Sequence, residues 1–249
     1  MEITLVLQYG RVGSISVVEA LQAAEVTPVL HLHKIDEDEV VGELQSYMRD
    51  GARVPDDLTW SAAALLLSRR NLPINVITLV REPFARDLSN LCYGLTDLGR
   101  YGGPEGAAAE FTRRDATFAS RWLLRNIVAF TGIDIFAEPF DRERGYSFYR
   151  RGRFRLLVMQ TELENAAKET ALQSFLRLSA PPVLPHANAT RIAAGEHDAL
   201  MAALRAMPAR ALRYDWQLAD TFYGRERLAS HLERRGMGHL LEGAPPPLG

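Results

Sequence analysis

Apolar residues occur along this chain in two alternating patterns, short unbroken runs and longer stretches with helical spacing. The runs at residues 3–8, 28–33, 74–80 and 155–159 are mostly apolar, and the third is rich in β-branched side chains. Such runs are typical of strands in a parallel sheet that helices cover on both sides. Their alternation with helical stretches predicts an α/β fold of three layers, α/β/α, with a central parallel sheet and right-handed crossovers.

The first helical stretch follows the first strand, where Val17, Val18 and Leu21 have the spacing of a buried helix face. Thr161 and Glu164 have the spacing of a capping box, which predicts a helix after the last strand. Further helices are predicted at residues 37–48, 58–68 and 110–130 and, between proline-rich breaks, from Pro181 onward.

Composition bounds the class of protein. With 249 residues, 47% of them hydrophobic, the chain can bury a full core, so we expect one domain over residues 1–240 and a disordered tail over residues 241–249. The net charge of -2 argues against generic nucleic-acid binding, which needs a strongly basic chain or patch. The lone cysteine, Cys92, excludes an internal disulfide and favours a reducing compartment, and no stretch is apolar enough to span a membrane. We therefore expect a cytoplasmic protein without a membrane span.

The turn after the first strand has residues suited to an anion. Gly13 lets backbone approach a ligand, Ser14 and Ser16 carry hydroxyls, and Arg11 adds a fixed charge, although the Lys-Ser/Thr ending of a nucleotide-hydrolysing P-loop is missing. The turn also has a purely structural interpretation. In that case Gly13 only permits a tight turn, and Ser16 forms a capping box with Glu19.

A second turn of the same kind follows the third strand. Arg81 ends the strand, Pro83 suits the first turn of the next helix, and Ser89 lies eight residues after Arg81 on that helix. In an open parallel sheet, ligands bind beyond the carboxyl ends of the strands, where both turns are expected. The alternative for Arg81 is a salt bridge to Asp87 or Glu82.

The paired turns, "QYGRVGSISV" and "VREPFARDLSNL", resemble those of the sulfotransferase superfamily, which uses 3'-phosphoadenosine-5'-phosphosulfate. Together with "HLH" and "TGIDIFAEPFDRERGYSFY", they are also similar to bacterial proteins named for capsular polysaccharide synthesis. The resemblance implies a P-loop NTPase-like sulfotransferase fold with a helical C-terminal part. It also implies that the 5'-phosphosulfate is held by Arg11, Gly13, Ser14, Ile15 and Ser16, and the 3'-phosphate by Arg81 and Ser89, with Arg86 matching the pattern in an undefined role.

The chain departs from the family pattern at three points. Arg11 replaces a common lysine, and arginine keeps the charge but does not donate its proton to a leaving phosphate. This makes Arg11 an electrostatic stabiliser in catalysis. Glu82 replaces a common asparagine, and the C-terminal Arg-Lys-Gly motif of the small-molecule enzymes is not recognised, which disfavours phenol and steroid acceptors.

Two histidines at the end of the second predicted strand are candidates for the catalytic base. His31 and His33 are two residues apart, so their side chains share one face of the strand, and imidazole has a pKa suited to base catalysis. We favour His33, which is nearer the carboxyl end, with His31 orienting it. The alternatives for the base are Glu162, Asp36 and Glu37. A metal site is disfavoured because no carboxylate or cysteine completes the usual spacing.

The predicted function is therefore transfer of a sulfuryl group to a hydroxyl of a carbohydrate or related acceptor. Two alternatives stay open, a P-loop-like kinase or nucleotide hydrolase and a non-catalytic nucleotide-binding protein of surface-polysaccharide assembly. The sequence does not predict the oligomeric state. An anionic acceptor could be bound by a local basic run that also contains aromatic residues, namely Arg142, Arg144, Arg150, Arg151, Arg153 and Arg155.

Overall fold

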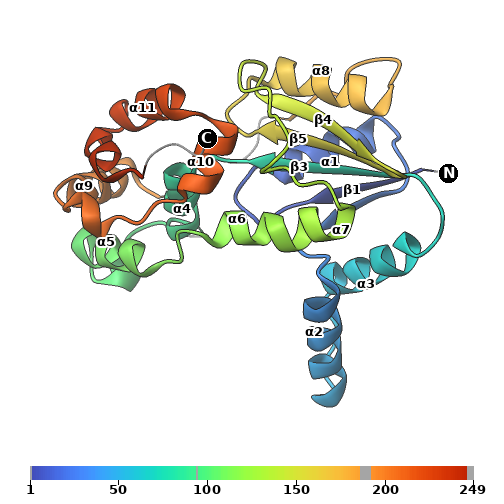
Figure 1. Cartoon of the computed structure of the whole chain (residues 1–249). Helices are drawn as coiled ribbons and strands as arrows, with labels where there is room; N and C mark the ends of the chain where they lie inside the picture. The colour runs from blue at the N-terminus through green and yellow to red at the C-terminus, as the bar shows by residue number, and fades with distance from the viewer. Residues whose placement is uncertain (1, 94, 186–191, 246–249) are drawn as a thin grey trace. The chain divides into compact units, whose positions relative to one another are not determined.

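The computed structural model describes residues 2–93, 95–185 and 192–245 of the chain. It confirms an α/β protein with a central, mostly parallel sheet of five strands (Figure 1). The chain divides into two compact units, and each is described by itself. Unit 1 consists of Met1–Val80 and Arg121–Ala187, and unit 2 consists of Arg81–Ser120 and Asn188–Gly249.

The sheet of unit 1 has the strand order β2-β1-β3-β5-β4. The first four strands in this order are mutually parallel, and β4 pairs antiparallel with β5 at the edge. Because β1 lies between β2 and β3, the direction of winding reverses at β1 and β3, and the crevice beyond their carboxyl ends is where open α/β sheets bind ligands. The strands are β1 (Ile3–Leu7), β2 (Val29–Leu32), β3 (Ile74–Val80), β4 (Tyr146–Arg151) and β5 (Phe154–Gln160).

The strands differ in burial according to their place in the sheet. Every residue of the central strands β1 and β3 is buried, which explains their unbroken apolar runs. The edge strand β4 is only partly buried, and its arginines and aromatic residues hide the strand pattern in the sequence. This strand was missed by the sequence analysis, which interpreted the same residues as a basic run.

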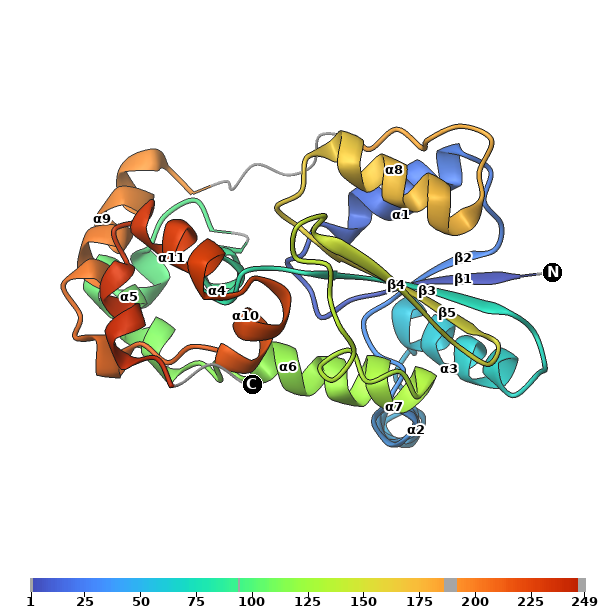
Figure 2. The ribbon, with the colours of Figure 1, turned by 45° about the horizontal axis from the view of Figure 1, so that its top comes forward.

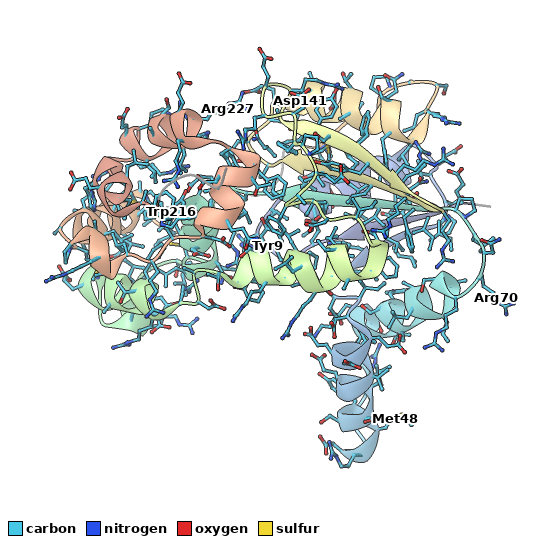
Figure 3. All side chains as sticks on the ribbon, in the orientation of Figure 1. Tyr9, Met48, Arg70, Asp141, Trp216 and Arg227 are labelled. Atoms are coloured by element: carbon cyan, nitrogen blue, oxygen red, sulfur yellow. The ribbon has the colours of Figure 1, made fainter. Side chains whose placement is uncertain are left out.

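Helices cover both faces of this sheet. Helices α1 (Ser14–Ala23) and α8 (Asn165–Leu176) lie on one face, and α3 (Asp56–Ser68) and α7 (Ala129–Thr131) lie on the other (Figures 1 and 2). Three layers are therefore present, as expected. Helix α2 (Glu37–Arg49) runs away from the sheet, and Met48 near its end is exposed (Figure 3).

The single long helix predicted over residues 110–130 is wrong. Helix α5 (Pro104–Arg113) ends before a short turn, and α6 (Phe118–Leu123) continues through a π-helical segment, Leu124–Val128, into α7. The break comes from Asp115, whose carboxylate accepts hydrogen bonds from the amide and the hydroxyl of Thr117. Such local side-chain bonds compete with helical backbone bonds.

Unit 2 is helical and has its own apolar core. Phe84 and Phe111 pack in this core with ring centroids 5.3 Å apart, and buried leucines from both of its chain segments surround them. Leu240 belongs to the same core. Gly238–Gly243 forms a 3-10 helix, whereas a disordered tail was expected from residue 241 onward. Residues 246–249 lie outside the described residues. The α-helices of this unit are α4 (Pro83–Leu91), α5, α9 (Ala194–Arg205), α10 (Trp216–Phe222) and α11 (Arg225–Glu233).

Candidate functional site

The turn after β1 contains three residues in the left-handed region of backbone conformation. The φ angles are 83° at Gly10, 62° at Arg11 and 79° at Gly13. Glycine adopts this conformation at little cost, whereas a residue with a Cβ adopts it uncommonly. Arg11 is therefore held in an unusual backbone conformation by the structure around it.

Helix α1 begins directly after this turn without a side-chain cap. Gly13 is its N-cap residue and Ser14 its first residue, so Ser16 lies within the first turn of the helix. The alternative in which Ser16 caps the helix with Glu19 is therefore wrong. Because the first amides of a helix have no intrahelical acceptor and carry the positive end of its dipole, this start favours an anion.

Thr161, immediately after β5, fixes the position of the turn. Its hydroxyl donates to the carbonyl oxygen of Val12 at 2.9 Å, and its amide donates to the carbonyl oxygen of Val80 at 2.8 Å. The predicted capping box of Thr161 and Glu164 is wrong, because α8 begins at Asn165 with no side-chain cap. The threonine hydroxyl instead connects the glycine turn to the end of β5.

A cavity of ≈ 270 Å³ lies beside the start of α1. Gly13 and Ser16 line it from α1, Leu79 lines it from β3, and Asn165 and Lys168 line it from α8. The lining residues place this cavity near the carboxyl end of β3 and beside α1 and α8. These two helices lie on the same face of the sheet (Figure 2).

The two candidate histidines lie together, as their spacing predicts. Their ring centroids are 4.9 Å apart in an edge-to-face contact. His31 Nε2 lies 3.0 Å from the hydroxyl of Ser14, and His33 Nδ1 lies 3.3 Å from the carbonyl oxygen of Gln8. A carbonyl oxygen only accepts, so Nδ1 of His33 carries a proton, and in the neutral ring Nε2 keeps the lone pair that a base needs. His33 is exposed.

Burial determines the protonation of the other histidine. The pKa of His31 is lowered to about 4, chiefly because the ring is removed from water and secondly because of repulsion from His33. His31 is therefore neutral at physiological pH. A neutral ring in contact with His33 and bonded to Ser14 suits the orienting role expected of it.

The connection that carries His33 is held by side chains from the helical run that ends in α7. The indole nitrogen of Trp122 donates to the carbonyl oxygen of His33 at 2.9 Å. The fully buried Asn126 accepts from the amides of Ile35 and Asp36 at 2.6 and 3.1 Å. Trp122 also packs on Tyr9, with ring centroids 5.5 Å apart.

In unit 2, the turn after β3 leads into α4 as the sequence predicts. Pro83 occupies the first turn of the helix, and Glu82 caps it by accepting from the amides of Phe84 and Ala85 at 2.8 and 2.9 Å. Glu82, at the position where the sulfotransferase resemblance leads one to expect asparagine, is thus a helix cap. Its carboxylate also accepts a hydrogen bond from the hydroxyl of Tyr214.

Arg86, whose role the resemblance leaves undefined, has structural contacts in unit 2. It is buried, forms an ion pair with Asp87 at 2.7 Å, and packs over the ring of Phe118 at 4.7 Å. The pKa of Asp87 is raised by burial, and Arg86 opposes this shift.

A second cavity, of ≈ 160 Å³, brings Arg81 and Ser89 together. Arg235 and His197 line the same cavity, and neither is predicted as a site residue from the sequence. Arg235 lies 3.8 Å from the carboxylate of Glu82 and donates to a carbonyl oxygen one turn earlier. No local spacing signals these residues, because they lie more than a hundred positions from Arg81 in the sequence.

The predicted site residues thus fall into two sets. Arg11, Gly13, Ser14, Ile15, Ser16 and His33 belong to unit 1, while Arg81 and Ser89 belong to unit 2. The side chain of Ile15 is half exposed, and Ile15 is the second residue of α1. The expected acceptor run is largely engaged elsewhere, since Arg151, Arg153 and Arg155 donate to backbone carbonyl oxygens.

The described residues contain no group of three or more histidine, cysteine or acidic side chains that could hold a metal ion. Within the same residues, every helix is too short or too polar to cross a membrane. Comparison of the chain with family models, with curated proteins and with solved structures found no match.

Proposed function

We propose that this protein is a sulfotransferase that moves a sulfuryl group from 3'-phosphoadenosine-5'-phosphosulfate to a hydroxyl of a carbohydrate or related acceptor. The observation that carries the proposal is the uncapped start of α1 beside a cavity lined by a lysine, at the strand ends where the sheet reverses its winding.

The 5'-phosphosulfate binds at the turn after β1 in this proposal. The backbone amides of Gly13, Ser14, Ile15 and Ser16 provide partial positive charge, and Arg11 adds a fixed one. The short distance between Ser14 and His31 links this turn to the histidine pair. Anion and base chemistry are thus both available at the carboxyl ends of β1 and β2.

The 3'-phosphate binds at the cavity beside α4. Arg81 and Ser89 supply a guanidinium and a hydroxyl, and Arg235 supplies a second guanidinium in the same cavity. Two arginines and a hydroxyl suit a phosphate monoester, because charged hydrogen bonds to phosphate contribute about 1.5–3 kcal/mol each. A nucleotide without a 3'-phosphate gains nothing from this cavity.

The chemical step is an in-line displacement at sulfur. The acceptor oxygen forms a bond to sulfur while the bond between sulfur and the bridging oxygen breaks, and the electron pair leaves with the 5'-phosphate. Nε2 of His33 accepts the proton of the acceptor hydroxyl, and Arg11 stabilises the charge on the departing phosphate. The Gln8 contact supports this role, because it selects the tautomer of the neutral ring in which Nδ1 holds the proton and Nε2 is the acceptor.

Calorimetric titration with adenosine 3',5'-bisphosphate, ADP, AMP and ATP tests the proposal. We expect the bisphosphate to bind at least about tenfold more tightly than ADP, the gain from one good charged contact. Arg81→Gln should abolish this preference, while Arg49→Gln, on an exposed arginine of α2, should leave it intact. A preference for ATP that depends on magnesium would replace the proposal with a kinase or hydrolase.

Transfer of labelled sulfate from the donor to a panel of carbohydrates then tests turnover. We expect His33→Ala to bind the bisphosphate normally and to lose transfer, because its role is to take a proton. Tight binding without any transfer by the unmodified protein would favour a non-catalytic nucleotide-binding protein.

A further inference from the structure

The cavity beside α1 is lined by Lys168, a residue of α8 that is distant from the glycine turn in the sequence. Gly13 and Ser16 also line this cavity, as does Asn165, which lies about one helical turn from the lysine in α8. The two helices lie on the same face of the sheet (Figure 2). The cavity is therefore lined by the start of a helix, a hydroxyl, a carboxamide and the side chain of a lysine.

Lys168 differs from the only other lysine in the chain, Lys34. Lys34 is engaged by two carboxylates, with Glu39 at 3.4 Å and Glu43 closer still. In contrast, within the described part of the chain, the ammonium of Lys168 forms no hydrogen bond or ion pair. It is half-buried without a direct partner, which is an unfavourable state for a charged group.

The surroundings of Lys168 compensate its charge only in part. Burial lowers the pKa of its ammonium, and attraction to Glu162 and Glu164 opposes this shift. Both carboxylates come from the connection between β5 and α8, whereas Gly13 and Ser16 on the α1 side are neutral. An anion that enters the cavity would supply the missing compensation.

We propose that Lys168 is the cation that binds a tetrahedral oxyanion group, sulfate-like or phosphate-like, in the cavity at the start of α1. The inference deepens the proposed function and rests on it for the identity of the ligand, whose 5'-phosphosulfate is the group in question. The lysine that the glycine turn lacks in its own sequence is supplied by the neighbouring helix. It adds a compact ammonium to the delocalised charge of Arg11.

Calorimetric titration with inorganic pyrophosphate tests this inference directly, because the probe carries no adenosine and no 3' group. We expect Lys168→Met to weaken pyrophosphate binding about 10- to 100-fold, the range for a lost charged hydrogen bond. The matched control is Lys34→Met, which removes the other lysine and should change binding by less than about twofold. Thermal melts establish that both variants are folded.

Adenosine 3'-monophosphate provides a second arm, because it lacks the 5' group. Its affinity should be the same for Lys168→Met and the unmodified protein. Equal pyrophosphate binding by the two proteins overturns the inference, as does failure of the unmodified protein to bind pyrophosphate. Pyrophosphate binding that depends on Lys168, without any preference for adenosine 3',5'-bisphosphate over ADP, refutes the sulfotransferase proposal and leaves the inference standing.

The pH dependence separates binding from a merely structural role. As the pH rises toward the lowered pKa of Lys168, its ammonium loses the proton, so pyrophosphate affinity falls at a lower pH than for an ordinary lysine. Lys168→Arg keeps its charge at all accessible pH values. We expect this variant to bind pyrophosphate with no such fall above neutral pH, and the same fall in both proteins overturns the inference.

Discussion

The side chain of Asn126 holds the connection between β2 and α2 in place through hydrogen bonds. Its replacement by alanine tests how much these bonds stabilise the protein. The side chain is fully buried, and its Oδ1 accepts from the amides of Ile35 and Asp36 at 2.6 and 3.1 Å. Its Nδ2 donates to the carbonyl oxygen of Trp122 at 3.2 Å. Alanine removes all three bonds and leaves the backbone groups without this partner.

The expected loss of stability follows from how deeply the two backbone amides are buried. Ile35 is buried, so its orphaned amide costs about 1–3 kcal/mol, and the half-buried amide of Asp36 adds less because water can reach it. We therefore expect Asn126→Ala to lower the free energy of unfolding by about 2–4 kcal/mol. For a chain of this length, that corresponds to a fall in Tm of roughly 5–15 °C.

Urea denaturation followed by circular dichroism measures this loss, with thermal melts as a second readout. Asn71→Ala is the matched control, because the side chain of Asn71 is exposed, and it should stay within about 0.5 kcal/mol of the unmodified protein. If Asn126→Ala were equally stable, the two amide bonds would not hold this connection. The positioning of His33 by its neighbours would then need another explanation.

Two further predictions concern the turn and the histidine pair. Because the pKa of His31 is lowered to about 4 in the folded chain, the unfolded chain binds an extra proton between pH 6.5 and 4. The free energy of unfolding should therefore fall as the pH drops through this window. The expected fall is about 1–2 kcal/mol, because the ring is partly exposed and solvent screens its charge. His31→Gln should show a smaller fall in urea titrations at the same pH values. Gly13→Ala should cost about 1–2 kcal/mol because φ is 79° there, although the nearest atom to an added Cβ is 3.9 Å away. Its control, Gly42→Ala in α2, should instead stabilise by about 0.5–1 kcal/mol in the same assay, and equal effects would contradict the strain argument.

The pattern of hydrophobic residues predicts the buried strands of the sheet correctly. β1, β3 and β5 are apolar on both faces because helices cover them, so their runs are unbroken in the sequence. Edge strand β4 was missed for the opposite reason. It is half exposed and contains two arginines. One of them, Arg151, donates to the carbonyl oxygen of Gly132, which only the folded chain brings near.

The residues of the candidate site also differ in whether the sequence predicts them. Residues that act through local geometry, such as the glycine turn or the neighbouring histidines, are visible because their spacing determines their placement. Lys168 and Arg235 are not, because they reach their cavities from helices formed by other parts of the chain. Thr161 shows that spacing alone does not determine the partner of a side chain. Its spacing predicts a cap for α8, whereas its hydroxyl donates to the carbonyl oxygen of Val12.

The alternation of the two units along the chain has a consequence for biosynthesis. As the ribosome extends the polypeptide, the parallel part of the unit 1 sheet is complete only once β5, which pairs with β3, has emerged. By then residues 81–120 have already left the ribosomal tunnel. Their apolar residues stay uncovered until α9, which is translated later, packs in the same core. A chain that ended after Ala187 would contain the complete sheet but would leave the apolar residues of segment 81–120 without the later helices that cover them.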